Sequence, residues 1–437
     1  METKQEKPRW ILHCDCNSFF ASVELLEHPE LKRLPVAVCG DPDGRHGIIL
    51  AKNEPAKKYG IQTAEVIWQA KQKCPDLVLL PSHREKYQHY YQVINAIYQQ
   101  YTTRVEPFSV DESWLDVTNT WHLYAESPKA LGDQIRNRVH AETGLTISVG
   151  VSFNKVFAKM GSDYKKPDAT TLISRENYKD IVWPMPVSAM LFVGRRLAEK
   201  LASMQLRTIG DVAAADPLYL VQVLGKSGAE LSRNARGEDN APVRRWGESE
   251  PIKSVGNSTT YKRDLKGSAD LRAGIAALAD EVAGRLRRHG LYAGTVQITI
   301  KDNQLKSIQR QKQLPTSTHL AKDLEAAAWE LLQKNWDLSR PVRLLGVTAL
   351  GLTDTPLAVQ QSFFAEDTPK SSPKREALEK SLDKIRGKYG KHAIAGAYVL
   401  NNEIGLASLS MDENNAEREL NDDGSGRQVT KGPLGRK

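Results

Sequence analysis

Three acidic side chains occupy positions that suit metal-dependent chemistry on phosphates. Asp15 ends the strand-like segment WILHCD, and the adjacent pair Asp111-Glu112 follows a segment of alternating apolar residues. Mg²⁺ binds proteins through a few carboxylates and leaves its other positions to water and substrate phosphates. Two such ions can align an attacking hydroxyl, a phosphorus atom and a leaving pyrophosphate. An acidic pair at a hairpin tip is usually only solvated, but the separate Asp15 favours nucleotide transfer.

Local patterns predict the elements that position these carboxylates. Residues 9–15 alternate as a strand, and SFFASVELLEH predicts a helix with Asn17 or Ser18 as its N-cap. A helix rich in Tyr and Gln, at about 84–101, leads into the acidic hairpin. Further strands are predicted at 35–40, 47–53 and 145–154.

The composition bounds the class of protein. A chain of 437 residues is too long for one ordinary core, so roughly two to four domains are expected. With 40% hydrophobic and 26% charged residues it is typical of a soluble globular protein. No apolar run approaches the ~20 residues of a membrane span. The start, METKQEKPRW, lacks the apolar core of a secretory signal, so the cytoplasm is the expected location.

The cysteines do not indicate a metal site. All four (Cys14, Cys16, Cys39 and Cys74) lie early in the chain, and none forms a CxxC pair. A zinc site would need better ligand spacing than this. We therefore expect small buried residues in a reducing compartment.

Positive charge is concentrated in one segment. The net charge is +8, and residues 253–313 hold twelve Lys/Arg against five Asp/Glu. A basic surface attracts phosphate backbones and releases their counterions. A charge run alone is more often a solvated face, so this segment supports nucleic-acid binding only weakly.

The second half of the chain has a different organisation. Short helices with glycine-bearing turns are predicted at 186–240, and RRWGESEPIK (244–253) is a candidate linker. A small α+β unit follows. From about 356 the chain is polar, with an amphipathic helix at 374–390 and a tail whose last 25 or so residues are expected to be disordered. The α+β unit is predicted to contain helices at 270–289 and 319–335 and strands at 295–301 and 343–352.

Six blocks in consistent order resemble the Y-family translesion DNA polymerases, in particular their bacterial DinB-like branch. The likeness runs from about residue 9 to 355, about four fifths of the chain. It implies an α+β multidomain right hand with an added little-finger domain. The blocks are HCDCNSFFASVE, AKNEPAKKYGI, SVDESWLDV, SVGVSFNKVFAKMGSDYKKPD, FVGRRLAEKL and KSVGNSTTYKRDL. The implied domains are a palm (1–168) with fingers inserted at about 21–77, a thumb (169–243), a linker (244–253), a little finger (254–355) and a polar tail (356–437).

The resemblance also implies roles at the active site. Asp15, Asp111 and Glu112 match the family's catalytic carboxylates, with the Cys16 carbonyl as a further ligand of two Mg²⁺ ions. Phe20 matches the steric gate, whose ring fills the space of a ribose 2′-OH. Three further nucleotide contacts are implied: Phe19, Lys57 and Lys166. Phe19 could equally be a core aromatic, and Lys57 stands where the family has an arginine. Lys165 is the alternative to Lys166 if the register slips by one residue.

Further implied contacts involve DNA and a partner. Residues 188–211 resemble a helix-hairpin-helix with its turn at Val193-Gly194, and 224–231 resemble a weaker second copy. QQSFF (360–364) resembles the peptide that binds the bacterial sliding clamp, with Gln360, Phe363 and Phe364 as anchors; packing onto the protein's own surface is the alternative. The little-finger block supplies the candidate DNA contacts Lys253, Ser254, Gly256, Thr259 and Arg263.

Three departures from the family pattern affect nucleotide binding. Asn17 replaces an Asp found in many relatives, Glu54 replaces a tyrosine near the phosphates, and Lys57 lacks the two-pronged geometry of an arginine. The expected activity is low-fidelity primer extension from dNTPs on primer-template DNA, by a monomer. The rivals are a non-catalytic DNA- and clamp-binding paralogue and another palm-type enzyme such as a nucleotide cyclase, which would need no grip on a duplex.

Overall fold

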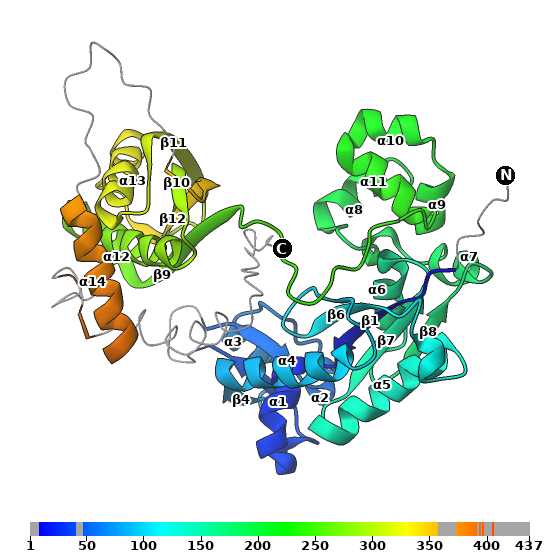
Figure 1. Cartoon of the computed structure of the whole chain (residues 1–437). Helices are drawn as coiled ribbons and strands as arrows, with labels where there is room; N and C mark the ends of the chain where they lie inside the picture. Colours follow the sequence, from blue (N-terminus) through cyan, green and yellow to red (C-terminus); the bar gives the residue numbers. More distant parts are fainter. Residues whose placement is uncertain are drawn as a thin grey trace. The chain divides into compact units, whose positions relative to one another are not determined.

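The computed structural model describes residues 8–40, 47–356, 373–390, 393–394, 396 and 404–405. These residues form two compact units: the chain up to Glu248 makes the N-terminal unit, and the chain from Ser249 makes the C-terminal unit. Both units mix helices and sheets (Figure 1), which confirms the α+β multidomain class. Within the described ranges, no helix is both long and apolar enough to cross a bilayer.

A five-stranded sheet forms the centre of the N-terminal unit (Figure 1). Its strands are β1 (Ile11–Cys16), β5 (Val105–Pro107), β6 (Glu112–Asp116), β7 (Ile147–Ser152) and β8 (Thr170–Ile173). They lie in the order β5-β6-β1-β7-β8, and only the β7–β8 pair is parallel. Every residue of β1 and β7 is buried, because both faces of the sheet are covered.

Helices cover this sheet on its two faces. On one face, α1 (Phe19–Glu27), α4 (Arg84–Gln99) and α5 (Pro128–Thr143) share a core with the even-numbered residues of β1. On the other face, α6 (Lys155–Tyr164) packs against β1 and β7. This approach is so close that a Cβ on Gly150 would lie 1.9 Å from the carbonyl oxygen of Ala158. The predicted strands at 9–15 and 145–154 and the helix at 84–101 are confirmed.

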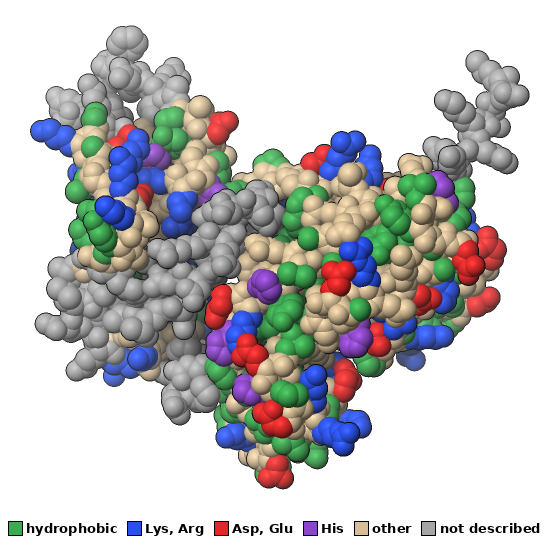
Figure 2. Space-filling view, turned by 60° about the horizontal axis from the view of Figure 1, so that its bottom comes forward, with side chains coloured by type: hydrophobic (Ala, Val, Ile, Leu, Met, Phe, Trp, Pro, Cys, Tyr) green, Lys and Arg blue, Asp and Glu red, His purple; other side chains and the backbone are tan. Residues whose placement is uncertain are grey.

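A smaller three-stranded sheet lies within the same unit. Its strands are β2 (Val36–Cys39), β3 (Ile49–Lys52) and β4 (Val78–Pro81), in the order β3-β2-β4. The accompanying helices are η1 (Pro29–Leu31), α2 (Glu54–Lys57) and α3 (Ile67–Lys73). All four cysteines are free and buried, as expected from their spacing. The face of the unit seen in Figure 2 carries interspersed acidic and basic side chains.

A helical region completes the N-terminal unit. It comprises α7 (Tyr178–Val182), the 3₁₀ turn η3 (Val187–Ala189), α8 (Arg195–Ser203), α9 (Ile209–Ala214), α10 (Pro217–Leu224) and α11 (Lys226–Ala235). Another 3₁₀ turn, η2 (Trp121–Leu123), lies earlier in the chain, between β6 and α5. Its core is continuous with Phe153 and Phe157, next to β7. The short helices expected at 186–240 are therefore present.

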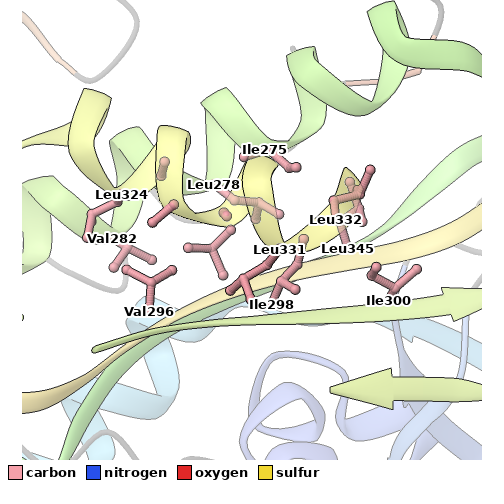
Figure 3. Close-up of a cluster of buried hydrophobic side chains, with 14 of the residues drawn as sticks. Ile275, Leu278, Val282, Val296, Ile298, Ile300, Leu324, Leu331, Leu332 and Leu345 are labelled. Carbon is pink, nitrogen blue, oxygen red and sulfur yellow. The ribbon is translucent and has the colours of Figure 1, made fainter. Parts of the chain in front are cut away.

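The C-terminal unit is an antiparallel sheet covered on one face by helices. Its elements are β9 (Ser254–Leu265), α12 (Gly267–Arg288), β10 (Tyr292–Asp302), β11 (Ser307–Thr318), α13 (Ala321–Asn335), β12 (Val342–Thr353) and α14 (Pro373–Tyr389). The strand order is β11-β10-β12-β9. Figure 3 shows Ile275 and Leu278 of α12 pointing toward Ile298 of β10, in the core of this unit.

The helices and the two central strands of this unit agree with the sequence-based prediction, whereas β9 and β11 were not predicted. Both lie at edges of the sheet. In β11 the residues of the run Gln309–Gln313 are all polar and alternate between glutamines and cations. Such a strand buries little apolar surface, so it lacks the alternating pattern that identifies a half-buried strand.

Candidate active site

Asp15 and Glu112 lie side by side because their strands pair in register. Asp15 of β1 is directly opposite Glu112 of β6 in an antiparallel ladder, which puts both side chains on the same face of the sheet. That face is the one covered by α6. Asp15 is only 4% exposed there, so the pair forms a largely buried acidic site at the end of β1.

Two lysines neutralise this pair. The Nζ of Lys159, on α6, donates to Asp15 Oδ2 at 2.8 Å and to Glu112 Oε1 at 2.5 Å. Lys166 Nζ lies 2.7 Å from the same Asp15 oxygen and 2.7 Å from Asp163 Oδ1. Lys166, predicted to contact a triphosphate, therefore lies at the carboxylates, with about a third of its side chain exposed.

Asp111 adjoins the pair but has a different partner. Its carboxylate accepts a hydrogen bond from Ser109 Oγ at 2.5 Å, and its backbone carbonyl accepts one from the Cys16 N–H at 3.0 Å. Cys16 is the last residue of β1 and is buried. Among the described residues, no three His, Cys, Asp or Glu side chains already form an ion-holding group. The structure thus brings Asp15 and Glu112 together and holds the Asp111 carboxylate to one side.

The electrostatics of the pair favour a divalent cation. Burial and the hydrogen-bonded Asp15 raise the pKa of Glu112 to about 8. Burial also acts on Asp15, but the hydrogen bond with Glu112 and the two lysines outweigh it and lower the pKa of Asp15. The two carboxylates therefore carry one negative charge more easily than two. A metal ion bound to both would stabilise the second charge, so the donor set fits such an ion.

The two predicted aromatic residues have different surroundings. Phe19 is 3% exposed in the core beneath the sheet, which leaves its backbone, not its ring, for contact with a nucleotide. Phe20 is half-buried, and its ring stacks on Tyr87 with centroids 4.1 Å apart and planes 14° apart. The Tyr87 hydroxyl donates to the buried carboxylate of Glu24, which also accepts from the His83 N–H. Phe20 is therefore held by a stacked and hydrogen-bonded support.

The residues that depart from the family pattern, in α2 and at Asn17, have ion-pair or hydrogen-bond partners nearby. Lys57 Nζ pairs with Glu54 Oε1 at 2.5 Å, so the unusual carboxylate has a cation. Asn17 donates from Nδ2 to Ser148 Oγ at 2.8 Å and accepts the Asp168 N–H at 2.9 Å. The N-cap of α1 is Ser18, with no side-chain cap hydrogen bond. Ser18, one of the two predicted N-caps, is therefore confirmed as the N-cap, while the Asn17 side chain joins β7 to the loop that carries Lys166.

The candidate DNA contacts in the helical region lie at the start of α8. Gly194 is the N-cap of α8, and Val193 is buried beneath it. Only the 3₁₀ turn η3 precedes them, so the first helix of the expected hairpin is very short. The second expected copy corresponds to α10 and α11, joined at Gly225 with a φ of 64°.

The candidate contacts of the C-terminal unit differ in how accessible they are. Lys253 is exposed just before β9, and Ser254 begins that strand. Thr259 is buried, and a Cβ on Gly256 would meet Thr348 Oγ1 at 2.5 Å, so both positions are closely packed. Arg263 is engaged by Asp270 at 2.5 Å.

The basic surplus of residues 253–313 is also partly neutralised inside the unit. Lys312 pairs with Glu330 of α13, and Arg287 pairs with two carboxylates of α14. Arg272 lies over the Trp329 ring at 4.1 Å. The charge run is therefore not a bare DNA-binding surface.

Sequence reasoning missed three residues of the site. Glu24 and Tyr87 lie within predicted helices and Lys159 lies within one of the six sequence blocks, but none of the three was assigned a role. The available signal was weak: Lys159 lies four residues before Asp163 on a helix, a spacing that brings two side chains together. The clamp-like motif with Gln360, Phe363 and Phe364 lies outside the described residues.

Comparisons with known proteins agree along most of the chain. Residues 14–163 match the impB/mucB/samB family, and residues 252–363 match its C-terminal domain. A DNA polymerase IV of Acetivibrio thermocellus is 44% identical over 90% of this chain and 98% of its own length. The DNA polymerase IV 1 of Bacillus subtilis is 36% identical over 91% of this chain and 94% of its own. A solved Y-family DNA polymerase chimera, 22% identical, has the same fold, with a TM-score of 0.69 over 78% of this chain and 98% of its own.

Paired carboxylates on a central sheet, together with these relatives, define the class: this is a DNA-directed DNA polymerase of the translesion type. The chain belongs to the impB/mucB/samB family, the Y-family of polymerases. The resemblance inferred from the sequence blocks is thereby confirmed. Enzymes of this family depend on a divalent metal ion.

Proposed function

We propose that this chain extends primers on a DNA template by transferring nucleotides from dNTPs, with Asp15, Asp111 and Glu112 as its catalytic carboxylates. The observation that carries the proposal is the register of β1 and β6, which sets Asp15 against Glu112 in a buried site. The presence of all three carboxylates argues against the non-catalytic alternative, because a decayed site has no physical need for them.

The metal in this proposal is Mg²⁺, two ions per site. The carboxylates of Asp15, Asp111 and Glu112 and the carbonyl of Cys16 would hold them. Bound there, the ions would activate the primer hydroxyl and stabilise the charge on the transferring phosphoryl group. Lys159 keeps Asp15 and Glu112 together. Lys166 lies on the more exposed side of the site, where it leaves Asp15 and binds the triphosphate of the incoming nucleotide.

Selection of the sugar is proposed for Phe20. A rigid aromatic ring excludes a 2′-hydroxyl by steric clash rather than by attraction. The stack on Tyr87 keeps Phe20 from turning aside, since Tyr87 is itself fixed to Glu24. Lys57, with Glu54, is proposed to approach the nucleotide from α2, because Glu54 lies 3.5 Å from Ser18 Oγ at the start of α1.

DNA binding is proposed for two regions. The Val193-Gly194 turn would present backbone N–H groups to a phosphate without reading sequence. In the C-terminal unit, the sheet face away from α12 and α13 includes the small residues Ser254, Gly256 and Ser258 of β9, which a DNA backbone can approach closely. We assign the palm to 1–168 with fingers at about 21–77, the thumb to 169–243, the linker to 244–253 and the little finger to 254–355.

Partners and location complete the proposal. The segment 360–364 would bind the sliding clamp through Gln360, Phe363 and Phe364, and this tether would raise the local concentration of a weakly retained enzyme. The enzyme acts as a monomer in the cytoplasm, where the chromosome of a bacterium lies. The segment belongs to the polar tail, 356–437.

Primer extension tests the catalytic assignment. We compare wild type, Asp111→Ala/Glu112→Ala and the control Asp133→Ala/Glu142→Ala, which removes two acids from the surface of α5, with Mg²⁺ and dNTPs. Wild type and control should extend the primer, while the catalytic variant loses activity by more than about 10³-fold. Equal extension by the catalytic variant would overturn the assignment. Inactivity of all three with intact duplex binding would favour the non-catalytic paralogue.

A further inference from the structure

The helix α14 lies beyond both family matches and beside α12 in the C-terminal unit (Figure 1). Buried ion pairs fix it there. The guanidinium of Arg287, on α12, pairs with Glu379 and Asp383 of α14, and its side chain is only 6% exposed. Glu379 also accepts the Ala321 N–H at 2.9 Å, which supplies an anionic partner to the N-terminus of α13. Arg386 makes two hydrogen bonds to Asp280, at 3.1 and 2.8 Å. We call this set of contacts the α14 latch.

The latch separates the charges of α14 by sign. Two of its three acids, Glu379 and Asp383, are turned inward, where they meet Arg287, and the third, Glu376, is half-buried. The lysines point to solvent and form no ion pair with any described residue. These lysines are Lys374, Lys380, Lys384 and Lys388. The outer side of the helix is therefore cationic although the whole helix carries acids as well.

The same outer side also carries apolar groups. Leu378 is 59% exposed and Tyr389 is 67% exposed. An amphipathic helix normally buries its apolar stripe, whereas α14 docks through charge and leaves that stripe outside. Figure 2 likewise shows basic and hydrophobic side chains together on the visible part of the C-terminal unit.

The spacing of the lysines suits a polyanion. Lys380, Lys384 and Lys388 follow one another at four-residue intervals, so they form one row along the helix with a rise of about 6 Å between neighbours. DNA carries a phosphate about every 3.4 Å along each strand. Glu376 precedes Lys380 at the same spacing but is half-buried, and from Lys380 to Lys388 the row contains no acid. Over that length its unpaired ammonium groups complement the charge of such a backbone.

We propose that the outer face of α14 is a second DNA-binding surface, which holds the phosphate backbone of duplex DNA through Lys374, Lys380, Lys384 and Lys388. α14 contacts α12 and the start of α13, the helices that cover one face of the sheet, so this surface lies on the helical side of the unit and not on the open sheet face. A duplex held on the sheet cannot also lie along α14. The surface therefore binds a separate stretch of DNA and raises retention on DNA without taking part in nucleotide transfer.

The test replaces all four lysines by glutamine in the full chain, which removes charge and keeps length. The matched control replaces four exposed lysines of the N-terminal unit, Lys32, Lys71, Lys129 and Lys179, by glutamine. Binding to a fluorescent hairpin duplex without a recessed 3′ end is followed by anisotropy across a range of salt concentrations. Circular dichroism verifies that α14 and the rest of the fold persist in both variants.

The expected result is a weaker dependence on salt. The slope of log K against log [salt] should fall by about 2–4 in the α14 variant, at ~0.9 for each phosphate that is no longer neutralised, and change little in the control. Nucleotide insertion at saturating primer-template should stay at the wild-type rate. Equal slopes in the two variants would overturn the proposal, as would unchanged duplex binding with loss of binding to RNA or to an acidic protein. Failure of primer extension by wild type would instead count against the proposed function, since duplex anisotropy does not depend on turnover.

Discussion

The active site and the α14 latch both bury carboxylates beside cations, but they use different cations. Lys159 joins Asp15 and Glu112 through a single ammonium group. Arg287 joins Glu379 and Asp383 through a planar guanidinium that reaches both at once. An ammonium group is a point charge, which a metal ion can replace, whereas a guanidinium fork matches carboxylates in a fixed geometry. The first site is built to exchange its cation and the second to keep it.

The two sites also differ in what happens when the cation is removed. In the active site the pKa of Glu112 is already raised. A proton on Glu112 can therefore replace the positive charge of the cation that is removed. In the latch Arg287 itself is the buried cation, and burial opposes but does not overcome its two carboxylates, so the pKa of Arg287 is raised. Burial also raises the pKa of Glu379, but protonation of that acid would still leave Asp383 without the guanidinium that binds it.

The largest expected effect comes from breaking the latch. Arg287→Ala should destabilise the C-terminal unit by about 3–5 kcal/mol, because breaking a buried pair leaves uncompensated charge. Native-state hydrogen exchange of the α12 amides measures this loss, with Lys334→Ala, an exposed partner of Glu330, as the control. A loss no larger than that of the control would show that α14 is only loosely attached.

The matching change in the active site should be smaller and reversible by metal. Lys159→Met should lower the stability of the metal-free protein by about 1–3 kcal/mol, since it leaves Glu112 without its lysine and Asp15 with Lys166 alone. Added Mg²⁺ should raise the unfolding temperature of this variant more than that of wild type, and should not rescue Arg287→Ala. If Mg²⁺ protected both variants equally, the contrast between an exchangeable and a permanent cation would disappear.

The stacked pair of Phe20 and Tyr87 acts by packing alone, in contrast to the two charged sites. Phe20→Ala should reduce discrimination against ribonucleotides by about 10–200-fold, because only packing separates the two sugars. Tyr87→Phe keeps the stacked ring and should keep most of the selectivity. Single-nucleotide insertion kinetics with dNTP and rNTP measure both. Unchanged selectivity in Phe20→Ala would remove Phe20 from the gate.

The active site should also make stability depend on pH. The pKa of Glu112 is about 8 in the folded protein against 4.5 in its ordinary state, so the folded state holds the extra proton between these values. This contribution is fully present below about pH 4.5 and is lost as the pH rises through 8. Denaturant titrations without metal should show the decline, and Glu112→Gln should remove it. A wild-type curve as flat as that of the variant would contradict the shared proton.

Much of the active site could be predicted from sequence because its residues lie in short blocks at the ends of strands. Asp15 and the Asp111-Glu112 pair are placed by β1 and β6, and each strand has a clear local pattern. Lys159 could not be predicted in the same way. Its partners are set by how α6 packs on the sheet, and that packing depends on Gly150, far from the carboxylates in sequence.

Long-range ion pairs explain what the charge distribution could not predict. Residues 253–313 hold a clear surplus of cations, yet Arg287 is neutralised by α14, 92 residues further along the chain. Arg263 is neutralised by Asp270 within the same segment. Composition counts charge along the chain, whereas binding depends on which side chains reach solvent after folding.

Counting bound metal ions tests the central claim most directly. Electron paramagnetic resonance of Mn²⁺, used in place of Mg²⁺, measures the ions held by the full chain with primer-template and a non-hydrolysable dNTP. Wild type and the control Asp133→Ala/Glu142→Ala should each hold two tightly bound ions, and Asp111→Ala/Glu112→Ala should lose both or all but one. The same number of bound ions in all three proteins would contradict the assignment of these carboxylates as metal ligands.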